Sequence, residues 1–325
     1  MLKLFRRNIL LNTLLLLPYI FVVHSGRFFV NYDQAEYSHS WLFQKITQSL
    51  SVSDQNYFYF SHILIFLQAY ILNVIANRVK IVPEGQLFPG LVFIILTGLH
   101  TSIFGVGPVL ISNLFFVLAL HSICSIYLNK NAILQLYNFG FFLGIACVFY
   151  LPASWFLVLG IFGLTVFRGF NLKEFLQTLS GFFTPIFLLF SLFYINNSLD
   201  IYWNNQVKEF FSPYILSMIF TSKGLIAFSI IILLFILAFV KFNLFQIKTQ
   251  IAAQKFFDFM FWTSLISFFS ILFFKIDSFS HIIFLITPLS ILLGVIVSKV
   301  KNELLVETIH LIFVLLGLFL QLQNW

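Results

Sequence analysis

The sequence predicts an all-helical protein whose helices cross a membrane as a bundle, and three observations lead to this class. The chain is 60% hydrophobic and only 9% charged, whereas a soluble domain carries about 25% charged residues. Apolar runs follow one another along its whole length, and about 20 such residues suffice to cross a bilayer. Polar residues gather between these runs and form no separate polar domain. We therefore expect a single transmembrane domain over residues 1–325.

Eleven apolar runs are candidates for membrane spans. The first ends at Ser25–Arg27, which is a poor cleavage site, so we expect it to stay in the protein as a span. Gly105–Pro108 turns the third run tightly into the fourth, and Pro152 divides the fifth from the sixth. The predicted spans are residues 8–24, 58–77, 88–104, 108–128, 132–149, 152–167, 175–195, 224–240, 256–274, 279–298 and 304–322.

The positions of the basic residues predict the orientation. With a cytoplasmic N-terminus, 13 of the 18 basic residues lie on the cytoplasmic side and five outside, as the positive-inside rule favours. The two long polar loops, residues 25–57 and 196–223, then face outward. Apolar residues recur near helical spacing in Trp41–Leu50, which predicts an amphipathic helix on the outer face. We expect an inner-membrane protein with periplasmic loops.

Composition also excludes some classes of function. The net charge of +7 does not indicate a nucleic-acid partner, because the basic residues are dispersed at the ends of apolar runs. Cys124 and Cys147 both fall inside apolar runs, where buried small side chains are expected. The sequence contains no CxxC, HExxH, P-loop or GxSxG pattern. The common motifs of metal sites, nucleotide sites and hydrolases therefore do not assign a function to this sequence.

The first outer loop carries the densest group of ionisable residues. Asp33, Glu36 and His39 are three residues apart, so they share one face if this stretch is helical. Arg27 stands a few residues before them. Titratable groups gathered at one membrane face are typical of an active site. The plain alternative is that loops are simply where polar residues collect.

The start of the tenth span is the second candidate region. It reads KIDSFSHIIFLITPLSILLG, with Lys275 and His281 at its outer end and Pro288 in its middle. Cations at this position could hold a phosphate by charge-assisted hydrogen bonds. Snorkelling to the interface would explain Lys275 equally well. His281 lies about one turn into the apolar run, where polar residues generally indicate function.

Together these features resemble the GT-C superfamily, the multi-pass glycosyltransferases that use polyprenyl-phosphate sugars. The resemblance rests on the layout: the outer loop of residues 25–57, the long stretch from NAILQLYNFGFF to GFFTPIFLLF, and a late span with polar residues and a proline. It implies that Asp33 or Glu36 is a catalytic base or metal partner. It also implies that Lys275 and His281 meet the donor phosphate. The acidic pair departs from the family in being spaced Asp-x-x-Glu rather than adjacent.

The segments FRGFNLKEFL and SHIIFLITPLSILL are also similar to a family of uncharacterised bacterial inner-membrane proteins. Three functions therefore stay open. The first is a glycosyltransferase using a polyprenyl-phosphate sugar donor, with Asp33 and Glu36 catalytic and Arg27, His39, Lys275 and His281 binding substrate. The second is a flippase or permease for a lipid-linked substrate, and the third is a non-catalytic subunit of an envelope assembly. Membrane lipid is the expected partner in each case, and a divalent metal would enter through the acidic pair.

Overall fold

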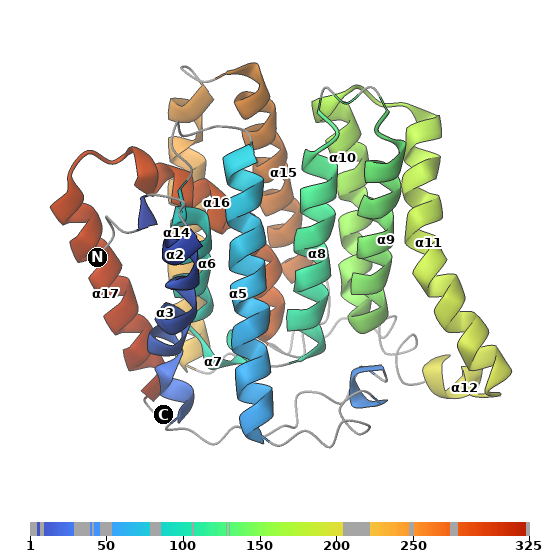
Figure 1. Ribbon diagram of the computed structural model, residues 1–325, viewed down its shortest axis with the longest axis horizontal. Helices are drawn as coiled ribbons and strands as arrows, with labels where there is room; N and C mark the ends of the chain where they lie inside the picture. The colour runs from blue at the N-terminus through green and yellow to red at the C-terminus, as the bar shows by residue number, and fades with distance from the viewer. Residues whose placement is uncertain are drawn as a thin grey trace.

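The described part of the protein is entirely helical. The computed structural model describes residues 5–6, 10–28, 40, 42–45, 54–78, 86–105, 107–127, 129, 131–203, 222–246, 250–273 and 279–322, and no strand occurs among them. The helices stand side by side as a bundle, with the chain running up and down through it (Figure 1). This confirms the predicted helical class.

The helices have the following bounds in chain order. They are α2 (Leu10–Leu14), α3 (Leu16–Val23), η1 (Ser25–Phe28), α5 (Asp54–Arg78), α6 (Phe88–Thr97), α7 (Thr101–Phe104), α8 (Pro108–Cys124), α9 (Ile133–Phe149), η3 (Leu151–Leu157), α10 (Val158–Phe167), α11 (Leu172–Ile195), α12 (Leu199–Tyr202), α14 (Ser222–Gln246), α15 (Ile251–Phe273), η5 (Phe279–Ile282), α16 (Ile283–Lys299) and α17 (Glu303–Leu322).

Five of the described helical stretches are long and apolar enough to cross a membrane. They are Asn56–Arg78, Leu172–Ile195, Lys223–Lys241, Phe279–Lys299 and Glu303–Leu322. Shorter apolar helices, such as Pro108–Cys124 and Ile133–Phe149, stand beside them. These lengths are consistent with an integral membrane protein. The count of eleven spans stays a prediction.

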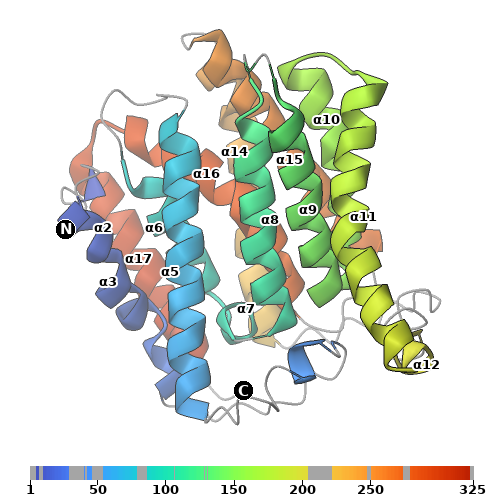
Figure 2. The same ribbon diagram turned by 45° about the vertical axis from the view of Figure 1, so that its right-hand side comes forward.

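Burial separates a central group of helices from peripheral ones. Every residue of α16 from Ile283 to Val295 is buried, and α16 packs against α5, α6, α8, α14 and α15. By contrast, α11, α14 and α17 expose apolar side chains along much of their length, such as Phe187, Leu233 and Leu311. Figures 1 and 2 show α11 along one side of the bundle and α17 along the other. The exposed apolar faces suit contact with lipid.

Helix α6 is short, and side chains of α5 hold its N-terminal end. Its 10 residues rise only about 15 Å, half of a bilayer core. The first backbone N–H groups of a helix lack partners within it, and here Asn73 Oδ1 accepts from Gly90 N at 2.8 Å. Asn77 Oδ1 accepts from Gln86 N, just before the helix, at 3.0 Å. Both asparagines come from α5, so α5 caps α6 inside the bundle.

The predicted third span, residues 88–104, is interrupted. It consists of α6 and the single turn α7, separated by Gly98, Leu99 and His100. The break occurs where His100 leaves the helical conformation and caps α7, with its Nδ1 accepting from Ser102 N at 3.2 Å. A polar turn therefore lies where the sequence suggested one continuous helix.

Candidate functional site

Four of the seven histidines lie at the same end of the bundle, which we call the histidine end. His24 follows α3, His62 lies near the start of α5, His100 precedes α7, and His281 belongs to η5. The His24 and His62 rings meet edge-on with centroids 5.6 Å apart. His24 also stacks on Phe104 of α7 at 4.4 Å, and α7 packs against η5. The four histidines therefore lie in or beside elements that contact one another, and we call them the histidine layer.

His281 is fully buried, and both of its ring nitrogens have partners. The Tyr150 hydroxyl lies 2.9 Å from Nδ1, and Ser270 Oγ lies 3.0 Å from Nε2. Ser270 donates its own hydrogen to Ser267 O at 2.7 Å, so Nε2 must be the donor toward Ser270. Nδ1 of the neutral ring then accepts from Tyr150. The cluster joins the turn after α9 to the end of α15 and the start of α16.

His24 and His62 are fixed in a similar way. Thr97 Oγ donates to Ile94 O at 2.9 Å, which leaves its lone pairs for His24 Nε2 at 3.3 Å. His62 Nδ1 lies 2.7 Å from Phe58 O. A carbonyl can only accept, so His62 donates from Nδ1. Hydrogen bonding thus selects one tautomer for each ring.

His100 lies in the turn between α6 and α7. Its ring packs on Phe279 with centroids 4.4 Å apart. Burial, together with the positive charge of Lys223, lowers the pKa of His100 from 6.5 to about 4. The side chain is therefore neutral near pH 7. This agrees with Nδ1 accepting the hydrogen bond that caps α7.

Gln321, near the end of α17, also lies at the histidine end. Its Nε2 donates to Val23 O at 2.9 Å and to Gly98 O at 2.5 Å. Its Oε1 accepts from Gly26 N at 2.9 Å. One amide side chain therefore joins the C-terminal ends of α3 and α6 to η1. The sequence did not predict this role, because Gln321 stands at the end of an apolar run, where a polar residue is expected to mark the end of a span.

The predicted site residues are described only in part. Asp33, Glu36, His39 and Lys275 lie outside the described residues, and so does the side chain of Arg27. The backbone of Arg27 belongs to η1, which packs against α17 at the histidine end. The structure thus brings Arg27 and His281 to the same end of the bundle. Because His281 already contacts Tyr150 and Ser270, direct phosphate binding by this ring would require one of those bonds to be exchanged.

The first outer loop has a second described anchor. Residues 42–45 are helical, as the predicted amphipathic helix requires, and Phe43 is buried. Leu42 packs against Val148 of α9 and against Leu189 and Phe193 of α11. Figure 1 shows this short blue segment beyond the end of α9, toward α12. The part described therefore rests on protein, and the prediction that the whole of Trp41–Leu50 lies on the outer leaflet stays a prediction.

A chain of buried polar side chains crosses the middle of the bundle. Asn113 Nδ2 donates to Gln68 Oε1 at 2.7 Å, and Thr287 Oγ1 donates to Asn113 Oδ1 at 3.0 Å. Gln68 in turn donates to Leu110 O at 3.0 Å. This network joins α5, α8 and α16. Sequence reasoning missed it, although an amide inside an apolar run was the available signal.

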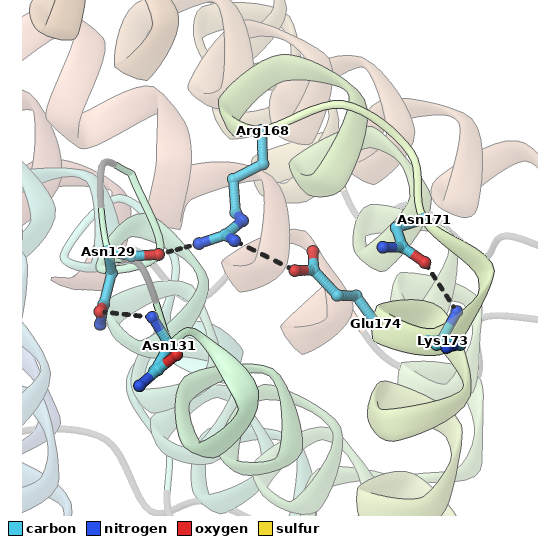
Figure 3. A network of polar contacts seen from close by, with 6 residues as sticks. All are labelled: Asn129, Asn131, Arg168, Asn171, Lys173 and Glu174. Carbon is cyan, nitrogen blue, oxygen red and sulfur yellow. Dashed lines mark hydrogen bonds and ion pairs between the residues drawn. The ribbon is translucent and has the colours of Figure 1, made fainter.

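The opposite end of the bundle carries a different polar cluster, drawn in Figure 3. Arg168 follows α10 and pairs with Glu174 in the first turn of α11, with N and O 3.1 Å apart. Arg168 also donates to Asn129 O in the turn before α9. Asn171 Oδ1 caps α11 by accepting from Lys173 N at 3.0 Å. This cluster joins the α8–α9 turn to the α10–α11 turn, and both charges have the favourable sign for the adjacent helix end.

The described residues contain no group of three His, Cys, Asp or Glu side chains that could hold a metal ion. Cys124 and Cys147 are buried free thiols, as expected. The histidine end offers imidazoles, hydroxyls and one amide in fixed orientations. Such groups can bind and orient a polar headgroup and can exchange protons.

The fold and this layer define the class of the protein: a helical bundle suited to a membrane, with a buried polar layer at one end. Comparison with protein-family models, with curated proteins and with solved structures finds no match to this chain. The function is therefore argued from the residues themselves.

Proposed function

We propose that this chain is an eleven-span membrane glycosyltransferase of the GT-C type that acts at the outer face of the inner membrane. It transfers a sugar from a polyprenyl-phosphate donor to an acceptor. The observation that supports this most is the gathering of four histidines at one end of an otherwise apolar bundle. The outer loop with Asp33 and Glu36 joins the bundle at this end, through η1 and the start of α5. A donor whose tail lies in lipid would present its phosphate there.

In this mechanism Asp33 or Glu36 accepts the proton of the acceptor hydroxyl as the sugar is transferred. Arg27, His39 and Lys275 are expected to bind the donor phosphate through charge-assisted hydrogen bonds. His281 follows Lys275 in the chain and is expected to hold the start of α16 in place, through its bonds to Tyr150 and Ser270. A divalent cation, where one takes part, would bind the two carboxylates.

Substitution of the acidic pair tests the proposal. Asp33→Asn and Glu36→Gln keep the size and polarity of the side chains but remove the proton acceptor. Loss of a general base typically lowers the rate about 10²–10⁴-fold. We expect one of the two variants, or both, to fail to restore the lipid-linked sugar profile of a deletion strain, at unchanged protein levels in the membrane.

The control for this experiment is Asp54→Asn, in the same loop region but at the first residue of α5. It should restore the profile as well as the parent does. If Asp33→Asn and Glu36→Gln both restore it too, the glycosyltransferase proposal is wrong, and a non-catalytic envelope subunit becomes the better proposal.

The orientation has its own test. Cysteines placed at Ser53 and Asn205, in the two long loops, should react with an impermeant thiol reagent from the outer side. Reaction only after the membrane is opened would reverse the assignment of the histidine end to the outer face.

A flippase or permease is the second candidate, and one observation favours it. The hydrogen-bonded chain of Gln68, Asn113 and Thr287 lies fully buried in the middle of the bundle. Polar residues at such depth often mark a transport pathway. If Asn113→Leu abolishes the phenotype while the acidic pair is dispensable, transport is the better proposal.

A further inference from the structure

Helix α17 is held to the N-terminal segment by three polar contacts spread along its length, and we call this contact the C-terminal seam. At one end Arg6 pairs with Glu303, with N and O 2.9 Å apart. In the middle the Tyr19 hydroxyl lies 2.7 Å from His310 Nε2. At the histidine end Gln321 forms its three hydrogen bonds to η1, α3 and the turn after α6.

The three α17 residues of the seam lie on one stripe of the helix. Glu303, His310 and Gln321 are 7 and 11 positions apart, which brings them within about 20° of each other around a helix of 3.6 residues per turn. Gly317 lies near the same stripe and lets the Gly98 backbone approach, since a Cβ at 317 would be 3.2 Å from Gly98 O. The polar contacts therefore form a single line along which α17 can separate.

Beyond the seam few side chains of α17 are buried, although Phe313, Val314 and Leu316 are partly buried against the core. Its buried residues are Val306, Gly317, Leu320 and Gln321, while the rest of its length is exposed or half-buried and largely apolar. Lipid is as apolar as these side chains, so no hydrophobic force presses α17 onto the bundle. An interhelical hydrogen bond inside a membrane changes an association equilibrium by only about threefold on average. A separated state of α17 is therefore accessible, and its exposed face loses nothing by moving through lipid.

The seam covers one side of the histidine end. Gln321 lies against Gly98 and Val23, and Thr97 and His24 are the residues next to them in the chain. Separation at this point would open His24, Thr97 and the Gly26 N–H to the bilayer. The His24 ring and the Gly26 N–H can donate hydrogen bonds, which suits an anionic headgroup.

We propose that α17 is a lateral gate: it separates from the N-terminal segment at its Gln321 end and admits a lipid with a phosphate headgroup from the bilayer. The headgroup reaches the histidine end between α17, α3 and α6, while the chain stays in lipid beside α3. The identity of the lipid as a polyprenyl phosphate rests on the proposed function. The motion of the gate does not.

Spin labels at Ile63 and Phe319, both exposed and on α5 and α17, measure the opening in lipid nanodiscs. We expect a main distance and a minor, longer one. Gln321→Leu removes three hydrogen bonds and should raise the minor population roughly tenfold or more, whereas Tyr19→Phe removes one and should raise it about threefold. Tyr19→Phe keeps the aromatic ring, so this variant still tests the gate if Gln321→Leu does not fold.

Tyr137→Phe is the matched control, because it removes the same atom from a hydrogen bond between two other helices, from Tyr137 to Thr184 Oγ1 at 3.1 Å. It should leave the distances unchanged. A single distance that is the same in the parent and in both seam variants would overturn the gate, whatever any sugar-transfer assay shows.

A photoreactive polyprenyl phosphate in phosphatidylcholine vesicles tests the ligand. Gln321→Leu should raise its labelling of the protein several-fold, without raising the labelling by a photoreactive phosphatidylcholine. Equal labelling by both lipids would overturn the phosphate-lipid ligand while leaving the measured opening intact. Selective labelling together with full activity of Asp33→Asn and Glu36→Gln would support the gate and reject the glycosyltransferase.

Discussion

Two pairs of parallel segments in this protein are held together by different forces. At α9–α11 two parallel helices approach until their backbones touch, through Gly140 and Gly144 on one helix and Gly181 on the other. At the C-terminal seam α17 and the N-terminal segment also run parallel, but side-chain hydrogen bonds and an ion pair hold them. Because lipid gives helices no hydrophobic reason to associate, close packing and polar contacts are the available forces. The closely packed α9–α11 contact therefore forms a fixed wall of the bundle. The polar C-terminal seam forms a wall that can separate.

The fixed wall supports the histidine end. Tyr150, which hydrogen-bonds His281, directly follows α9. Leu42 of the first outer loop rests on Val148, Leu189 and Phe193, at the ends of α9 and α11. Both the buried histidine and one anchor of the loop therefore depend on the glycine seam, so damage to this seam should disturb the site as well as the fold.

We expect the largest effect from a glycine-to-alanine substitution, made at Gly140 in the α9–α11 seam and at Gly317 in the C-terminal seam. A Cβ at residue 140 would lie 2.8 Å from Phe182 N and closer still to Thr178 O, which are backbone atoms that can yield only if α11 moves. A Cβ at 317 meets Gly98 O at 3.2 Å, and α17 can shift to relieve it. We expect Gly140→Ala to cost about 1–3 kcal/mol or more of stability, as overpacking does. Gly317→Ala should be nearly neutral, since alanine gains up to about 1 kcal/mol in helix propensity.

Thermal unfolding of the purified protein in detergent measures both changes. Gly169→Ala would be a poor control, because Gly169 has a φ of +99° and any side chain there is strained. Similar losses for Gly140→Ala and Gly317→Ala would show that α17 is packed as rigidly as α11, and would remove the distinction between the seams.

The sequence predicted the helical class, the positions of the apolar runs and the tight turns, because these follow from hydropathy and from proline and glycine. It did not reveal the seams. GFFLG at residues 140–144 is a spaced glycine pair inside an apolar run, but its partner Gly181 is far along the chain, and no local rule pairs them. The break after α6 was missed for a related reason, since it depends on His100 and on Asn73 and Asn77 of α5 acting from another helix.

The next expected effect is an acid sensitivity at His100, which lies next to the separable side. His100 is neutral in the folded protein because burial and Lys223 lower its pKa to about 4, whereas the unfolded chain has a pKa of 6.5. The unfolded state therefore binds more protons between these values, and stability is complete above pH 6.5 and falls as the pH drops toward 4. Protonation of Nδ1 also removes the cap of α7, two residues after the Gly98 carbonyl that Gln321 binds.

We expect the parent to lose on the order of 1 kcal/mol between pH 7 and pH 5 from this group. His100→Gln can still accept at this position but cannot be protonated, so its melting temperature should fall less over the same range. The spin-label distance across the C-terminal seam should broaden at pH 5 in the parent alone. An equal pH dependence of parent and variant would mean that another group controls the acid response.

The candidate site was predictable only in outline. The four histidines of the histidine end could be assigned to one face of the membrane, because each stands at or near the outer end of an apolar run. Their partners could not be assigned: Ser270 bonds His281 from 11 residues away and Tyr150 from 131. Gln321 reaches Val23 across 298 residues. Contacts between distant segments depend on how the helices pack, and the apolar runs are too alike in sequence to specify their neighbours.

We expect the smallest effect from neutralising two ion pairs. The two pairs have the same chemistry and occupy equivalent positions at the starts of two helices. Arg168–Glu174 braces the entrance to α11 and Arg6–Glu303 the entrance to α17, with N–O distances of 3.1 and 2.9 Å. The side chains of the first pair are 23% and 19% exposed, and those of the second 38% and 41%. Water screens the second pair more strongly, so distance alone does not rank them.

Glu174→Gln should cost about 1 kcal/mol, because it also leaves Arg168 as an unbalanced, mostly covered charge beside the Asn129 carbonyl. Glu303→Gln should cost less than about 0.5 kcal/mol, and raising the salt concentration should erase its effect first. Double-mutant cycles with Arg168→Gln and Arg6→Gln separate each pair energy from the loss of the carboxylate alone. A stronger coupling at Arg6–Glu303 than at Arg168–Glu174 would contradict the ranking by exposure. It would also favour the Arg6–Glu303 end of α17 as the hinge about which the Gln321 end turns.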